Sequence, residues 1–207
     1  MNGKASNQKW SSPLILIEVS IRAGSNEDPP MSLSIQHVAT TPIARGLKTL
    51  SALLDKANAH AEATGVDPDA YVTARLFEDM LPLSGQIQRA SDTAKGAISR
   101  LAGVEAPPMA DDETTFAQLQ DRVAKTLAYV ESVPAAGFDG AEGREIVVPA
   151  GPGITLGFTG LEYLLEFVIP NFQFHVVTAY DILRHKGVPI GKRDFLGIGP
   201  ERLKTAA

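Results

Sequence analysis

The sequence of 207 residues has 44% hydrophobic and 21% charged residues, which is typical of one globular domain long enough to bury a core. Its formal charge of −5 and the lack of a basic stripe argue against nucleic-acid binding, because a phosphate backbone requires clustered positive charge. The absence of cysteine excludes disulfides, thiolate metal sites and cysteine nucleophiles. No apolar run approaches the roughly 20 residues that span a bilayer. We therefore expect a cytoplasmic protein that binds neither nucleic acid nor membrane.

Residues 1–30 differ in character from the rest of the chain. They contain one short apolar run, Leu14 to Ile17, which is shorter than the apolar region of a secretory signal. The acidic residues Glu18, Glu27 and Asp28 also argue against a mitochondrial presequence. We therefore expect residues 1–30 to be a disordered N-terminal extension and residues 31–200 to form the folded domain.

The first long helix is predicted between Ser32 and about Ala63, where apolar residues recur at three- and four-residue steps. Pro42 should kink this helix or mark the start of its main part. Gly65 should end it as a left-handed cap. Asp67 followed by Pro68 then predicts a capped short turn.

Two further helices follow at regular spacing. The second should begin near Met80 to Pro82 and run to Leu101. An acidic loop with two prolines separates it from the third. Thr115 with Gln118 is a capping-box pattern that should start the third helix, which ends by Pro134. Its expected buried stripe is Phe116, Leu119, Val123, Leu127 and Val130.

The segment from 135 to 158 is glycine-rich and has two short β-branched runs, Glu145–Val148 and Ile154–Phe158. The residues between these runs favour a turn, so we expect a small β-hairpin or irregular flap.

The last helical stretch runs from Thr159 to Gly187. Pro170 should divide it into a short helix from Gly160 and a longer one from about Pro170 to Lys186, because proline removes a backbone hydrogen bond. The expected buried face contains Leu161, Leu165, Val168, Phe172, Val176, Ala179 and Leu183. The tail that follows should pack back through Ile190, Phe195 and Leu196.

These elements predict an all-α protein, a four-helix bundle of the up-down kind with one crossover and a small β-hairpin or flap before the last helix. His175 falls on the apolar face of the last helix, and Asn171 precedes it by one turn. A histidine and an amide placed toward a core need partners. Gln86 of the second helix is the expected partner of His175, and Asp79 and Asp92 complete the set of pocket candidates.

Each of these signals has two interpretations. His175 is either a core histidine satisfied by its neighbours or a pocket base or remaining metal ligand. Asp79 is expected to cap the second helix rather than to take part in chemistry. Asp92 could orient a ligand or only face solvent.

Two segments resemble a known family: LFEDMLPLSGQIQRASDTAKGAISRLAG and PNFQFHVVTAYDILRHKGVPIGKRDFLG. They are similar to an uncharacterised family of unknown function (nineteen ninety-three) in the DinB/YfiT-like helical bundle superfamily. The resemblance covers about Met31 to Gly197 and implies a four-helix bundle that is often dimeric. It also implies, for other members of the superfamily, a divalent metal held by one histidine of the second helix and an HxxxH pair of the last. Some of those members transfer thiols to small molecules.

This chain departs from that metal-binding pattern. Asn171 and His175 stand where the HxxxH pair would be, and Gln86 is the nearest polar residue of a second helix without histidine. One imidazole and two amides are poor ligands for nickel or zinc, so we expect no metal and no cofactor.

Three hypotheses follow for the function. The first is a homodimeric bundle that binds a small molecule in a polar pocket without metal catalysis. The second is a divalent-metal-dependent transferase or hydrolase of the superfamily, so that catalysis stays an open alternative. The third is a dimeric interaction module. The degenerate ligand set favours the first hypothesis over the second.

Overall fold

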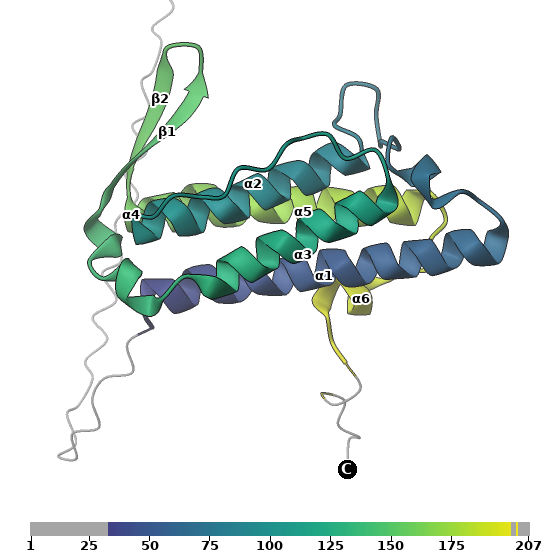
Figure 1. Ribbon diagram of the computed structural model, residues 1–207, viewed down its shortest axis with the longest axis horizontal. Helices are drawn as coiled ribbons and strands as arrows, with labels where there is room; N and C mark the ends of the chain where they lie inside the picture. Colours follow the sequence, from purple (N-terminus) through teal and green to yellow (C-terminus); the bar gives the residue numbers. More distant parts are fainter. Residues whose placement is uncertain (1–32, 200–201, 203–207) are drawn as a thin grey trace, which may run out of the picture. The chain divides into compact units, whose positions relative to one another are not determined.

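The computed structural model describes residues 33–199 and 202, and the predicted N-terminal extension lies outside these described residues. The described part is mostly helical and carries a small two-stranded antiparallel sheet. Four long helices lie alongside one another (Figure 1): α1 (Ile35–Thr64), α2 (Leu83–Ala102), α3 (Phe116–Ser132) and α5 (Ile169–His185). The apolar side chains between them form the core. No helix in this part of the chain combines the length and the apolar character needed to cross a membrane.

Helix α1 begins and ends at local signals in its sequence. Ser34 caps its start by accepting a hydrogen bond from the backbone nitrogen of His37 at 3.2 Å. Gly65 ends it in the left-handed conformation with a φ of 72°, as predicted. The predicted start at Pro42 is wrong, because this proline lies inside the helix. Burial of Ile35 and Ala39 in the core holds the turns that precede it in helical form.

Helices α2 and α3 flank the long loop that connects them. Gly103 ends α2 with a φ of 67°. Thr115 and Gln118 form the predicted capping box at the start of α3, with each side chain accepting from the backbone nitrogen of the other residue. We call residues 104–114, between these two ends, the strap. It runs along α2 and α3 (Figure 1).

The predicted hairpin is present and slightly longer than expected. Strand β1 (Glu145–Gly151) pairs antiparallel with β2 (Ile154–Thr159), and Val148 stands opposite Leu156. A short 3₁₀ helix, η1 (Pro68–Tyr71), lies between α1 and α2. Two more, η2 (Ala135–Phe138) and η3 (Ala141–Gly143), lie between α3 and the hairpin.

The predicted longer helix from about Pro170 to Lys186 is confirmed as α5, which has Pro170 in its first turn, but the chain before it stays helical without a break. A short α4 (Gly160–Glu162) leads into the π-helical segment η4 (Tyr163–Val168), which passes directly into α5. A π-helical turn holds more residues than an α-helical turn, so it rotates the preceding residues around the axis. The predicted burial of Leu161 and Leu165 is therefore wrong. Their side chains are 45% and 48% exposed. The residues buried in this segment are Tyr163, Leu164 and Val168.

The C-terminal tail packs on α1, as expected, and includes a short helix α6 (Lys192–Leu196) that the sequence did not indicate. Thr49 of α1 donates to the carbonyl of Phe195 at 3.3 Å. The Phe195 ring meets Tyr180 of α5 edge to face, with the ring centroids 5.8 Å apart. Ile190 is buried in the core.

The close approach of α1 and α5 generates a stability prediction. A Cβ atom at Gly46 would stand 2.8 Å from Cζ of the buried Phe172 and closer still to Cε1. We expect Gly46→Ala to destabilise the protein by about 1–3 kcal/mol, because a ring packed in the core cannot move aside freely.

The matched control is Gly143→Ala in η3, where a new methyl meets no atom within 4 Å. Its free energy of unfolding should stay within about 1 kcal/mol of wild type or rise, since alanine restricts the unfolded chain more than glycine does. Chemical denaturation of both variants measures the difference. Equal stabilities for the two would contradict the packing described for α1 and α5.

Candidate functional site

Helices α2 and α5 meet at the predicted hydrogen bond between His175 and Gln86. Nδ1 of His175 lies 2.8 Å from Oε1 of Gln86. Gln86 is only 2% exposed, and its amide nitrogen donates to the carbonyl of Leu81 at 3.0 Å. His175 itself is half-buried. The expected orientation of His175 toward the second helix is therefore confirmed.

This series of hydrogen bonds determines which nitrogen of His175 carries the proton. A backbone carbonyl only accepts, so Gln86 must turn its amide nitrogen toward Leu81 and its oxygen toward His175. The amide oxygen also only accepts, so Nδ1 of His175 donates. In the neutral ring, Nε2 then keeps a lone pair that can accept a hydrogen bond.

Burial and a nearby positive charge favour the neutral form of His175. Burial first, and then the charge of Arg89, lower the pKa of His175 below its ordinary value. The ring of Phe174 stands edge-on to the imidazole, with the centroids 5.3 Å apart. Phe174 is 57% exposed. The site therefore offers a hydrogen-bond acceptor beside an exposed aromatic ring.

Asn171 forms a separate connection between the same two helices. Its amide nitrogen donates to Oγ1 of Thr93 at 3.0 Å, and Thr93 donates to the carbonyl of Arg89 at 2.7 Å. Asn171 thus lies one turn before His175, as predicted, but its hydrogen bond goes to Thr93 and not to Gln86.

The predicted capping role of Asp79 is wrong. Asp79 is exposed in the segment before α2, and the start of that helix has no side-chain cap. The backbone nitrogen of Leu83 donates instead to the carbonyl of Ala74 at 2.8 Å. That of Ser84 donates to the carbonyl of Val72 at 3.1 Å. Because the preceding segment satisfies these groups, α2 needs no capping side chain.

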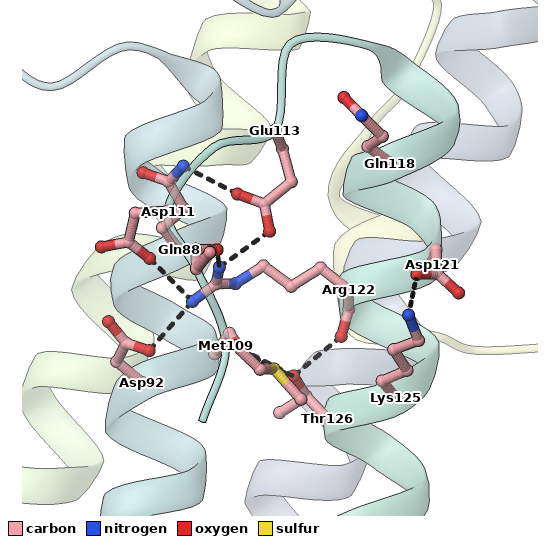
Figure 2. Close-up of polar contacts among 12 residues, drawn as sticks. Gln88, Asp92, Met109, Asp111, Glu113, Gln118, Asp121, Arg122, Lys125 and Thr126 are labelled. Atoms are coloured by element: carbon pink, nitrogen blue, oxygen red, sulfur yellow. Dashed lines mark hydrogen bonds and ion pairs between the residues drawn. The ribbon is translucent and has the colours of Figure 1, made fainter. Parts of the chain in front are cut away.

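Asp92 belongs to a second polar cluster, which joins α2, α3 and the strap (Figure 2). At its centre is Arg122 of α3, a side chain that is 2% exposed. Nη2 of Arg122 lies 2.9 Å from Asp92 and 3.0 Å from Asp111 of the strap. Nη1 donates to Oε1 of Glu113 and to the carbonyl of Ala110, at 2.8 and 2.7 Å. We call these residues the Arg122 cluster.

The ion pair between Arg122 and Glu113 holds both side chains in their charged forms. Burial raises the pKa of Glu113, but the hydrogen bonds that it accepts from Arg122 and Gln88 outweigh this effect and bring the pKa below its ordinary value. Burial likewise lowers the pKa of Arg122. Its carboxylate neighbours raise it by more, so that the pKa lies above its ordinary value. The guanidinium and the Glu113 carboxylate therefore both stay ionised at neutral pH.

Further polar side chains lie beneath the strap. The hydroxyls of Ser91 and Thr126 are 2.6 Å apart, and both contact the sulfur of Met109. Lys95 donates to the carbonyl of Pro107 at 3.4 Å. Four of the seven buried polar side chains of the described chain gather here: Ser91, Lys95, Arg122 and Thr126. Beneath the strap, α2 and α3 therefore bury polar groups that find their partners in each other and in the strap.

Arg122 was not expected to be buried, because the apolar stripe of α3 looked complete without it. In the structure Arg122 and Thr126 are buried, while the expected stripe member Leu127 is only half-buried. A signal was present: Leu119, Arg122, Thr126 and Val130 recur at the same three- and four-residue steps. An acidic run just upstream also supplies the partners that a buried arginine requires.

Neither cluster has the ligands of a metal centre. Within residues 33–199 no three histidine, cysteine or acidic side chains are placed to hold a metal ion together. At the first cluster, His175 is accompanied by the amides of Gln86 and Asn171, which are weak ligands for zinc or nickel. In the second, the guanidinium of Arg122 stands between the carboxylates. These donor sets do not fit the divalent metal that the resemblance implies for other members.

Comparison with known proteins identifies relatives of the chain. The family described as Domain of unknown function (DUF1993) matches residues 36–196. The crystal structure of a DinB family member protein from Shewanella denitrificans is 42% identical in sequence. It superimposes with a TM-score of 0.74, and the match covers 82% of this chain and 95% of that chain. No curated protein sequence matches.

The hydrogen bond between α2 and α5 predicts how substitutions at His175 affect stability. His175→Ala should lower the free energy of unfolding by about 1–3 kcal/mol, because the buried oxygen of Gln86 loses its donor. His175→Gln should recover part of this loss, since an amide can still donate. Denaturant unfolding of wild type and both variants measures these differences. An alanine variant as stable as wild type would exclude a structural role for His175.

Proposed function

The chain belongs to the DinB-like family of unknown function DUF1993, and we propose that it binds a small molecule at His175 without metal catalysis. The observation that carries this proposal is the hydrogen bond from Nδ1 of His175 to the anchored amide of Gln86. This bond leaves Nε2 as an acceptor in a ring whose lowered pKa keeps it neutral. In our proposal the protein is a cytoplasmic four-helix bundle of the up-down kind with one crossover.

The surroundings of His175 define the class of ligand. An acceptor nitrogen selects a ligand group that donates a hydrogen bond, such as a hydroxyl or an N–H. The exposed ring of Phe174 beside it favours an apolar or aromatic portion next to that donor. The ligand we propose is therefore a neutral, partly apolar molecule with one donor group at its end.

Phenol is a suitable probe for this site, because it has one hydroxyl donor on an apolar ring. In NMR titrations of untagged protein, phenol should shift the signals of the His175 and Phe174 rings, and His175→Ala should abolish the response. His185→Ala is the matched control, since His185 lies at the exposed end of the same helix. Equal responses in the two variants would contradict binding at His175.

The same protein preparations test the alternative of metal-dependent chemistry. We expect no stoichiometric binding of zinc or nickel to protein purified without a nickel column, because one imidazole and two amides bind such ions weakly. Stoichiometric metal that is lost in His175→Ala would instead support a metal-dependent transferase or hydrolase of the superfamily type.

We also propose that the protein is a homodimer. Exposed apolar side chains of the last helical stretch away from the ligand site, Leu161, Leu165 and Val177, would lose contact with water if they were buried across a two-fold axis. Light scattering at micromolar concentration should then give twice the chain mass of 22.0 kDa. A mass of one chain would contradict the dimer and leave the small-molecule proposal intact.

A further inference from the structure

A cavity of about 600 Å³ opens between the strap and α3, on the side where the Arg122 cluster lies. This volume is in the range of sites that hold small molecules. Its polar lining consists of Arg122, Lys125, Gln118 and the carboxylates of Asp112, Glu113 and Asp121. Its apolar lining consists of Pro107, Pro108, Met109, Ala110 and Ala128. The cavity thus combines an apolar wall with a small number of charged and polar groups.

A carboxylate already occupies the two donors beside this cavity. Oε1 of Glu113 accepts from Nη1 of Arg122 at 2.8 Å, and Oε2 accepts from the amide of Gln88 at 2.8 Å (Figure 2). Charge-assisted hydrogen bonds of this kind are the strong ones in proteins. Arg122 also has donor capacity to spare, because its buried Nε has no partner among the described residues. Arg122 and Gln88 together therefore form a clamp for a carboxylate.

The charges of the helices and of the strap are divided in a way that suits an acidic ligand. Around the cavity and the Arg122 cluster the helices contribute four cations, Arg89, Lys95, Arg122 and Lys125, against the two carboxylates of Asp92 and Asp121. The strap supplies three carboxylates, those of Asp111, Asp112 and Glu113. Without the strap the helices would leave a net positive charge at this place, in a chain whose formal charge is −5.

The strap is also attached in a way that permits displacement. Its contacts with the helices are mainly ion pairs and hydrogen bonds, and Val104 at its start is 42% exposed. A segment that buries little apolar surface opens at a lower free-energy cost than the core does.

We propose that this cavity binds a small carboxylic acid with an apolar body, and that Glu113 is an internal occupant which the ligand displaces. The ligand carboxylate takes the two hydrogen bonds that Arg122 and Gln88 now donate to Glu113. Glu113 turns toward solvent, and the apolar body lies against Met109 and the prolines of the strap. This site is distinct from His175, and it does not depend on the function proposed there.

Two alanine variants of the strap test the displacement. Glu113→Ala removes the internal occupant, whereas Asp112→Ala removes an equal charge that lines the same cavity but makes no ion pair with Arg122. Propionate, pentanoate and inorganic phosphate are the probes, and their affinities are measured by NMR titration after circular dichroism has shown that both variants are folded.

Glu113→Ala should bind propionate about ten-fold more tightly than wild type, which corresponds to freeing one charge-assisted hydrogen bond, and Asp112→Ala should match wild type. Pentanoate should bind more tightly than propionate, because its longer chain contacts the apolar wall. The double variant Glu113→Ala, Arg122→Gln should bind propionate no more tightly than wild type.

Equal affinities of Glu113→Ala and Asp112→Ala for propionate would overturn the proposal and leave the strap as a purely structural clasp. A gain that persists after Arg122→Gln would also overturn it. Phosphate binding as tight as that of pentanoate would show a general anion site and contradict the carboxylic acid with an apolar body.

Discussion

The constraint on which this structure depends is that α2 buries polar side chains on two of its faces. Gln86 points toward α5, while Ser91 and Lys95 lie beneath the strap next to α3. Burying a polar group without a partner destabilises the fold by more than one ordinary contact stabilises it. Each face of α2 therefore requires a particular neighbour. His175 of α5 supplies the partner of Gln86, and Thr126 of α3 supplies that of Ser91.

The two polar clusters differ in what they can do. At His175 the proton is confined to Nδ1 and the ring is kept neutral, so the outer nitrogen is an acceptor rather than a charge. At Arg122 every group is charged, and a carboxylate already sits on the donors. Arg89 connects the two, because its charge lowers the pKa of His175 while its guanidinium pairs with Asp111 of the strap. A ligand that moved the strap would therefore change the electrostatic environment of His175 as well.

Much of the fold could be predicted from local signals. Gly65 and the capping box of Thr115 mark helix ends because their chemistry is local, and the hairpin follows from β-branched runs on either side of a turn. The face of the last helix could not be predicted in full, since the π-helical turn before Pro170 rotates Leu161 away from the core. Arg122 was missed because its burial depends on carboxylates from a loop, whose path is set by tertiary contacts. Asp79 was misjudged because backbone carbonyls of the preceding segment, at Val72 and Ala74, satisfy the start of α2.

Gln86 of α2 determines which nitrogen of His175 carries the proton. A nitrogen–hydrogen correlation spectrum of the His175 ring, recorded at pH 6.5, the ordinary pKa of the side chain, measures this. We expect a mostly neutral ring with its proton on Nδ1 and a bare Nε2, because the amide oxygen of Gln86 only accepts. A proton on Nε2, or a ring that is at least half charged at this pH, would contradict it.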